Sequence, residues 1–161
     1  MAAPTVQLDY AMPARFHLEY TAEDGSKKTP IMVHCALIGS IERFMSVYLE
    51  HTAGWLPMWC APENVRILTV NNQVSDYVKK ITDILDDTTL EEPLPRNKIR
   101  YIVDESADSL GKKIRRATDM KIPVVLIVGP KDAEKGEVSV RLRDKEEKVS
   151  LTALADYLKD L

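Results

Sequence analysis

The stretch Ile122-Pro123-Val124-Val125-Leu126-Ile127-Val128-Gly129 is the longest apolar run in the chain. It has the length of a strand and falls far short of the roughly 20 residues that a membrane span requires. Its β-branched core, Val124 to Val128, is typical of a central parallel strand buried on both faces. The run therefore predicts the middle of an α/β sheet.

Upstream of this run, strands and helices alternate, which favours right-handed crossovers and a mostly parallel sheet. The apolar spacing predicts the following elements: a strand at Val65 to Val70, a helix on Val74, Val78, Ile81 and Leu85, a strand at Arg100 to Asp104 and a helix on Leu110, Ile114 and Ala117. Downstream, Glu137 to Leu142 alternates as another strand, and Ser150 is a suitable N-cap for a final helix. Asp86 to Lys98 is expected to be a surface loop, and the charged run Asp144 to Lys148 an exposed turn.

The first 60 residues show a different pattern. Thr5 to Tyr10 predicts a half-buried strand, and Phe16 to Tyr20 and Pro30 to His34 predict two strands joined by a hairpin at Asp24-Gly25. A helix is expected from about Ile38 to His51. The stiff, apolar Trp55 to Pro62 then reads as a connector, so we expect two parts, residues 1–60 and 63–161.

Composition restricts the class of protein. The chain has 161 residues, 45% hydrophobic and 29% charged, which excludes disorder of the whole chain. Two cysteines, Cys35 and Cys60, cannot build a disulfide framework, and no signal peptide is visible, so the expected location is the reducing cytoplasm. The formal charge of −3 gives no general argument for a nucleic-acid partner.

Positive charge is nevertheless concentrated locally. Between Arg96 and Lys121 there are eight Lys or Arg residues and four Asp or Glu residues. On the helix with Leu110, the cations Lys112, Arg115 and Arg116 lie opposite the apolar side and Lys113 flanks them. Arg141 and Arg143, two apart on a strand, are expected on one face of the sheet. These cations form either an ordinary solvated surface or a contact surface for phosphates and bases, and the count alone leaves both open.

Motifs for other chemistry are weak. His34 has no second ligand at metal-binding spacing, and a lone histidine is more often structural. No glycine-rich phosphate loop and no nucleophile elbow are present. The start of a helix at Gly39-Ser40-Ile41-Glu42-Arg43 favours anions only in general terms.

The order of several motifs is nevertheless specific. They are Thr5-Val6-Gln7-Leu8-Asp9-Tyr10, Pro30-Ile31-Met32-Val33-His34, Gly39-Ser40-Ile41-Glu42-Arg43-Phe44, Leu110-Gly111-x-Lys113-Ile114-Arg115, Val128-Gly129-x-Lys131 and Gly136-x-Val138-x-Val140-Arg141. Together they resemble the C-terminal third of threonyl-tRNA synthetases, over essentially the whole chain. The resemblance implies that residues 1–60 are the end of a class II catalytic domain with its motif 3. It also implies that residues 63–161 are an α/β anticodon-binding domain with a mixed, mostly parallel sheet.

The same resemblance implies functional residues. His34 corresponds to the third zinc ligand, Arg43 to the motif 3 arginine that contacts ATP, and Gln7 and Ser40 to positions beside the threonyl-adenylate. The positions that correspond to anticodon contacts are Arg115, Lys121, Asp132 and Arg141. The implied activity is the ATP-dependent attachment of threonine to its tRNA, with zinc, ATP and magnesium as cofactors and tRNA as the partner.

Some positions depart from the family pattern. Cys35 stands where arginine is usual, and Ala107 replaces an asparagine that contacts the anticodon loop. Motifs 1 and 2 and two zinc ligands are absent, so we expect the chain alone to bind tRNA and not to activate threonine, and to hold no cofactor tightly. A possible partner is the missing N-terminal part of the synthetase. The alternatives are a stand-alone RNA-binding or partner module without ligase activity, and a small α/β protein that binds no nucleic acid.

Overall fold

The computed structural model describes residues 5–90 and 97–161. The chain divides into two compact units, Met1–Ala53 and Gly54–Leu161, and each is described by itself. Among the described residues, no helix combines the length and apolar character needed to cross a membrane.

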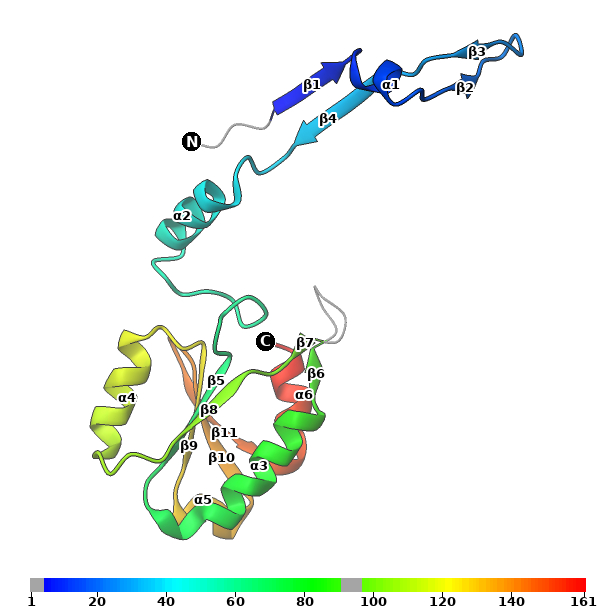
Figure 1. Cartoon of the computed structure of the whole chain (residues 1–161). Helices are drawn as coiled ribbons and strands as arrows, with labels where there is room; N and C mark the ends of the chain where they lie inside the picture. Colours follow the sequence, from blue (N-terminus) through cyan, green and yellow to red (C-terminus); the bar gives the residue numbers. More distant parts are fainter. Residues whose placement is uncertain (1–4, 91–96) are drawn as a thin grey trace. The chain divides into compact units, whose positions relative to one another are not determined.

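A five-stranded mixed sheet forms the second unit (Figure 1). Its strands, in chain order, are β5 (Val65–Thr69), β8 (Tyr101–Asp104), β9 (Val124–Val128), β10 (Glu137–Arg141) and β11 (Glu146–Ser150). Their order across the sheet is β11-β10-β9-β5-β8. The strand β5 pairs in parallel with β8 and β9, and β10 pairs antiparallel with β9 and β11. The predicted fold class, a mixed α/β sheet, is confirmed.

Helices cover both faces of this sheet. They are η1 (Asn72–Val74), α3 (Ser75–Asp87), α4 (Leu110–Asp119), α5 (Pro130–Lys135), η2 (Leu151–Ala153) and α6 (Leu154–Lys159). Figure 1 shows α4 on one side of the strands and α3 and α6 on the other. Accordingly Leu126 of β9 packs into the core beneath α3 and α6, whereas Val125 and Ile127 pack with Ala117 of α4. The strand β9 is thus apolar because both of its faces are buried.

Two predicted connections differ from the structure. The charged run expected to be a turn is largely strand β11, whose Glu146 lies opposite Arg141. An edge strand can carry charge because one of its sides faces water, so charge alone did not distinguish it from a turn. Part of the expected loop at 86–98 is also ordered: α3 continues to Asp87, and β6 (Thr89–Leu90) pairs with β7 (Asn97–Lys98). Residues 91–96 of that loop lie outside the described residues.

The first unit contains β1 (Thr5–Asp9), α1 (Met12–Arg15), β2 (Tyr20–Thr21), β3 (Lys27–Lys28), β4 (Met32–Ala36) and α2 (Ile41–His51). The turn at Gly25, with φ +77°, is confirmed, but the strands it joins are β2 and β3. The predicted pairing of Phe16–Tyr20 with Pro30–His34 is wrong, because β4 pairs with β1. The pattern missed α1, whose start is fixed by the Asp9 carboxylate accepting from the backbone N–H groups of Ala11 and Met12.

The first unit buries very little apolar surface. Pro13 is its only buried residue among residues 5–53. Leu8 and Val33, which pair across β1 and β4, are both 58% exposed, and Ile41 on α2 is 65% exposed. The second unit, by contrast, has fully buried leucines, isoleucines and valines in its core. Most of the apolar burial in the described chain therefore lies in residues 54–161.

Candidate nucleic-acid interface

The strands β10 and β11 present a face of the sheet that keeps contact with solvent. Val138 and Val140 point into the core, so Ser139 and Arg141 lie on the opposite face, the side of α4. Lys148 lies directly opposite Ser139, and Glu146 directly opposite Arg141, so both share that face. Glu146 and Lys148 are exposed, and Ser139 and Arg141 are half-buried. We call these four residues the open face.

Ion pairs tie the open face together in the free protein. Arg141 Nη1 lies 3.3 Å from Glu146 Oε2, and both side chains are about half exposed. Lys148 Nζ lies 2.8 Å from Asp132 Oδ1. The hydrogen bond and the negative charge of Asp132 raise the pKa of Lys148 above its usual value.

Asp132 itself is buried at the start of α5. Its second oxygen, Oδ2, accepts a hydrogen bond from the backbone N–H of Gly129 at 3.1 Å. Both carboxylate oxygens are therefore engaged, one with the helix start and one with the open face. Asp132 follows the carboxyl end of β9, whereas Lys121 precedes the other end and Arg141 pairs with Val125 near it. Asp132 thus lies at one end of β9 and Lys121 and Arg141 at the other, whereas Arg115, the fourth predicted contact, lies on α4.

Most of the cations on α4 are already occupied by protein partners. Lys112 pairs with Asp108 at 2.7 Å, and Arg116 pairs with Asp104 at 3.2 Å and also with Asp108. Hydrogen bonds from Lys112 and Arg116 lower the pKa of Asp108. Arg115 is exposed, and within residues 5–90 and 97–161 no ion pair includes it. Of the predicted basic surface on α4, Arg115 is therefore the cation left to contact a ligand.

Lys113 does not belong to the exposed surface predicted for this helix. It is 3% exposed, and its Nζ donates to the carbonyl oxygens of Thr69 at 3.1 Å and Asp104 at 3.0 Å. A lysine can do this because its long apolar stem packs along the helix and carries the ammonium to a distant acceptor. Lys113 therefore holds the fold at the carboxyl ends of β5 and β8.

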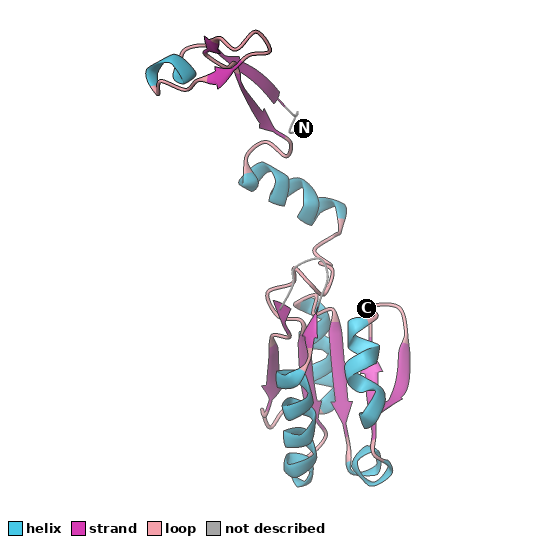
Figure 2. Ribbon diagram, turned by 90° about the vertical axis from the view of Figure 1, so that its right-hand side faces the viewer, coloured by secondary structure: helices cyan, strands magenta, loops and turns pink. Residues whose placement is uncertain are grey.

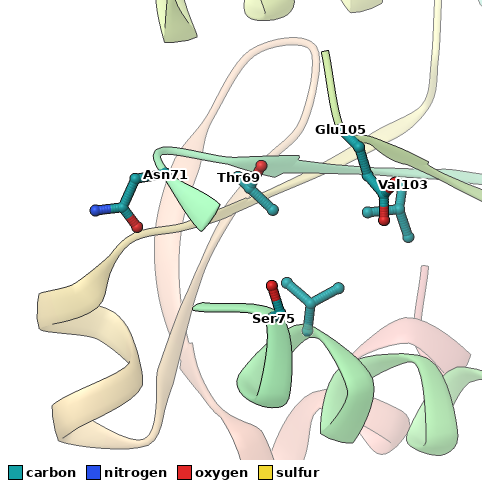
Figure 3. A pocket seen from close by; sticks show the side chains of 6 residues that line it. Thr69, Asn71, Ser75, Val103 and Glu105 are labelled. Carbon is teal, nitrogen blue, oxygen red and sulfur yellow. The ribbon is translucent and has the colours of Figure 1, made fainter. Parts of the chain in front are cut away.

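Two hollows open beside those strand ends. One, of about 340 Å³, is shown in Figure 3 and is lined by Thr69, Asn71, Ser75, Val78, Val103 and Glu105. The other, of about 280 Å³, is lined by residues that include Ala107, Asp108 and Lys113. Open α/β sheets commonly bind ligands in the crevice outside the carboxyl ends of their strands. Sequence reasoning missed Thr69 and Asn71, because neither belongs to a motif and only the strand order brings them beside Glu105.

In the first unit, Gln7 of β1 lies directly opposite His34 of β4, and both line a shallow hollow of about 750 Å³. His34 Nε2 lies 3.1 Å from Asp9 Oδ2. Ser40 is the N-cap of α2, and its Oγ accepts a hydrogen bond from the backbone N–H of Arg43 at 3.4 Å. The predicted residues thus fall into two groups, one on the β1–β4 pair and one at the start of α2 (Figure 2).

The described residues do not by themselves fit a zinc site. No group of three or more histidine, cysteine or acidic residues suited to a metal ion occurs among them. His34 has Asp9 beside it and no further ligand in that search, whereas zinc needs at least three protein ligands.

Comparison with known families decides what the second unit is. The family described as "Anticodon binding domain" matches residues 64–161. The chain belongs to this family. A second family, "tRNA synthetase class II core domain (G, H, P, S and T)", matches residues 2–52, ahead of the anticodon-binding domain. The predicted resemblance to threonyl-tRNA synthetases is confirmed by the individual relatives.

Those relatives are much longer than this chain. A threonine–tRNA ligase from Gloeobacter violaceus is 48% identical over 144 residues, which cover 89% of this chain and 22% of the relative. A threonine–tRNA ligase catalytic subunit from Sulfurisphaera tokodaii is 43% identical over 157 residues, covering 98% of this chain and 27% of the relative. The crystal structure of the RNA binding domain of threonyl-tRNA synthetase from Cryptosporidium parvum is similar at a TM-score of 0.81 and 30% identity, covering 98% of this chain and 38% of that one. The anticodon-binding domain and the residues before it thus span about a quarter of the length of the curated relatives.

Proposed function

We propose that this chain binds the anticodon arm of a threonine tRNA through the open face and the neighbouring surface of α4. The observation that carries the proposal is Arg141 on an uncovered part of the sheet within a domain of the anticodon-binding family. Bases in an anticodon loop are unstacked, so a protein side chain can reach their edges. Arg141 can present two parallel N–H donors to such an edge once Glu146 releases it.

The other predicted contacts have distinct tasks in this proposal. Arg115 and Lys121 are exposed cations that contact phosphates and set the position of the RNA. Asp132 acts through Lys148, which it holds over the open face by the 2.8 Å ion pair. Ala107, at the edge of the hollow beside Lys113, supplies no polar group of its own to the loop.

We further propose that residues 1–60, of which 2–52 match the class II core family, act as part of a catalytic domain that uses ATP with magnesium to activate threonine in the cytoplasm. Arg43, Gln7, Ser40 and His34 would contribute to that site together with the rest of a synthetase. Arg43 suits ATP because a guanidinium offers both charge and a flat stacking surface. We expect the chain alone to hold neither zinc nor ATP tightly. Among the described residues no group of three possible metal ligands occurs at His34, and Arg43 by itself cannot build an ATP site.

The proposal is tested by titrating a fluorescently labelled anticodon stem-loop of threonine tRNA with the full chain and following anisotropy. We expect specific binding that weakens steeply with salt, and weaker binding to a stem-loop with a mismatched anticodon. Arg141→Ala should weaken binding by roughly 1–3 kcal/mol, the cost of one lost base contact. Lys80→Ala, on the opposite side of the sheet in α3, is the matched control. Equal binding of matched and mismatched loops would contradict the proposal.

A further inference from the structure

An aromatic side chain with two cations over its ring lies in the connector before β5. Lys121 Nζ is 5.3 Å from the centroid of the Trp55 ring, and Arg143 Cζ is 5.6 Å from it. All three residues belong to the unit Gly54–Leu161. They come from three segments distant in sequence: the connector, the residue after the C-cap of α4, and the residues after β10.

The packing around Trp55 is close and specific. A Cβ placed on Gly54 would lie 3.6 Å from Lys121 Cγ, so the lysine stem lies against the connector backbone. Lys121 has φ +57°, in the left-handed region that few residues other than glycine occupy. This conformation ends α4, because the backbone N–H groups of Lys121 and Ile122 donate to the carbonyl oxygens of Thr118 and Ala117. The turn directs the Lys121 side chain toward Gly54 and Trp55.

These two cations are less closely paired with carboxylates than their neighbours are. Among the described residues no ion pair includes Lys121, and Arg143 has only Asp144 at 3.9 Å, whose side chain is 88% exposed. By contrast Arg141, Arg116 and Lys148 are all paired at 3.3 Å or less. The Trp55 ring attracts each cation through its electron-rich face but cancels no charge. Two positive charges beside one ring are therefore neutralised less than the other cations of this surface.

We propose that Lys121 and Arg143, held over Trp55, form a binding site for an RNA backbone phosphate. This inference rests on the proposed function, to which it adds Arg143 and Trp55. An ammonium and a guanidinium together suit a phosphate, since one supplies a compact charge and the other a fork of N–H donors. Arg143 follows Arg141 by two residues at the same end of β10. An RNA strand whose base contacts Arg141 would therefore pass close to Lys121 and Arg143. Trp55 is a positioning residue that keeps the two cations together.

The test is the salt dependence of binding, measured with the full chain and the anticodon stem-loop by fluorescence anisotropy. Arg143→Gln should remove one phosphate contact. The plot of log association constant against log salt concentration should then become less steep by about 0.7–0.9, and binding should weaken about sixfold at roughly 0.1 M salt. Trp55→Ala should lower affinity similarly, whereas Trp55→Phe, which keeps an aromatic ring, should preserve most of it. Lys80→Gln is the control for removal of a cation elsewhere.

A second measurement, of Trp55 fluorescence, tests the inference even if Trp55→Ala does not fold. In a Trp59→Phe background Trp55 is the only tryptophan, so its fluorescence should change on addition of the stem-loop and should change less in Arg143→Gln. If wild type binds RNA but Arg143→Gln and Trp55→Ala retain its affinity and salt slope, and Trp55 emission does not change on addition of RNA, this inference is overturned and the proposed function stands. If wild type binds no stem-loop, both are overturned.

Discussion

Lys113 donates from Nζ to the carbonyl oxygen of Thr69 at 3.1 Å, and so joins α4 to the carboxyl end of β5. The same ammonium reaches the carbonyl oxygen of Asp104 at 3.0 Å, at the end of β8. One buried side chain thus links a helix to two parallel strands. The hollow lined by Lys113, Asn71 and Asp108 opens directly beside this contact, so its shape depends on it.

Replacement of Lys113 should therefore destabilise the anticodon-binding domain. Lys113→Met keeps the apolar stem but leaves the carbonyl oxygens of Thr69 and Asp104 without their donor, and we expect a loss of about 1–3 kcal/mol. Urea denaturation followed by tryptophan fluorescence measures it, because Trp55 and Trp59 both lie in this unit. Lys112→Met, which breaks only a surface pair with Asp108, should cost at most about 1 kcal/mol. Equal losses of unfolding free energy in the two variants would show that the buried hydrogen bonds of Lys113 stabilise the domain no more than the surface ion pair of Lys112.

The stability of this domain should fall in acid, partly through Asp104. Burial tends to raise the pKa of its carboxyl, but hydrogen bonds from Ser106 and the charges of Lys113 and Arg116 outweigh burial and lower the pKa below 3.8. Ionised Asp104 therefore stabilises the fold at pH values above 3.8, and this contribution is lost as pH falls through the lower, folded-state pKa. Thermal unfolding of wild type and Asp104→Asn should differ most near neutral pH and converge in acid. Asp119→Asn, an exposed change on α4, should run parallel to wild type throughout.

Asn64 should be among the most sensitive polar positions. It is fully buried, its side-chain amide donates to the carbonyl oxygen of Met58, and its Oδ1 accepts from the backbone N–H of Arg100 at 2.6 Å. Asn64→Ala leaves the buried carbonyl oxygen of Met58 and the backbone N–H of Arg100 without their partner. We therefore expect the free energy of unfolding, measured by urea denaturation, to fall by about 2–4 kcal/mol. Asn71→Ala, which removes an exposed N-cap, should cost only about 1 kcal/mol. An Asn64→Ala loss no larger than that control would contradict the role assigned to Asn64.

Removal of the partner of Arg141 should strengthen RNA binding. Glu146→Gln keeps the shape of the side chain but removes a carboxylate 3.3 Å from the Arg141 guanidinium. Because that pair must open before Arg141 can contact RNA, we expect a gain of up to about 1 kcal/mol, the upper range for an exposed pair. Anisotropy titration of Glu146→Gln and of Glu134→Gln, an exposed change on α5, provides the comparison. Weaker binding by Glu146→Gln would indicate that Glu146 itself contacts the RNA favourably.

Strong local patterns predicted the elements of the sheet domain well. The strand β9 was evident from Val124 to Val128 because both of its faces are buried, and α3 was evident from its apolar spacing. The strand β11 was missed because Val149 is its only buried residue and charge surrounds it. The helix α1 was missed because it has only four residues and its second residue is Pro13, which indicates the end of the preceding strand rather than the start of a helix.

The partners of individual side chains could not be predicted in the same way. A helical wheel places Lys113 beside the exposed cations, and only the strand ends at Thr69 and Asp104 explain its burial. The cluster at Trp55 was invisible for the same reason, since Lys121 and Arg143 lie on either side of β9 and β10 in the sequence. Family resemblance supplied candidate positions such as Arg115, but not which cations are already neutralised.

The central position of β5 also affects how the domain is made. This strand is the first of the sheet to be synthesised, yet its neighbour β9 is the third, and β5 lies between β8 and β9. At about 5–20 residues per second, a growing chain exposes one hydrogen-bonding edge of β5 for several seconds before Val124–Val128 can cover it. Because Val65, Ile67 and Leu68 are fully buried in the finished fold, the nascent chain carries an apolar, unpaired strand during that time. Protection of this segment by chaperones or the ribosome would therefore matter more here than in a fold built from sequential hairpins.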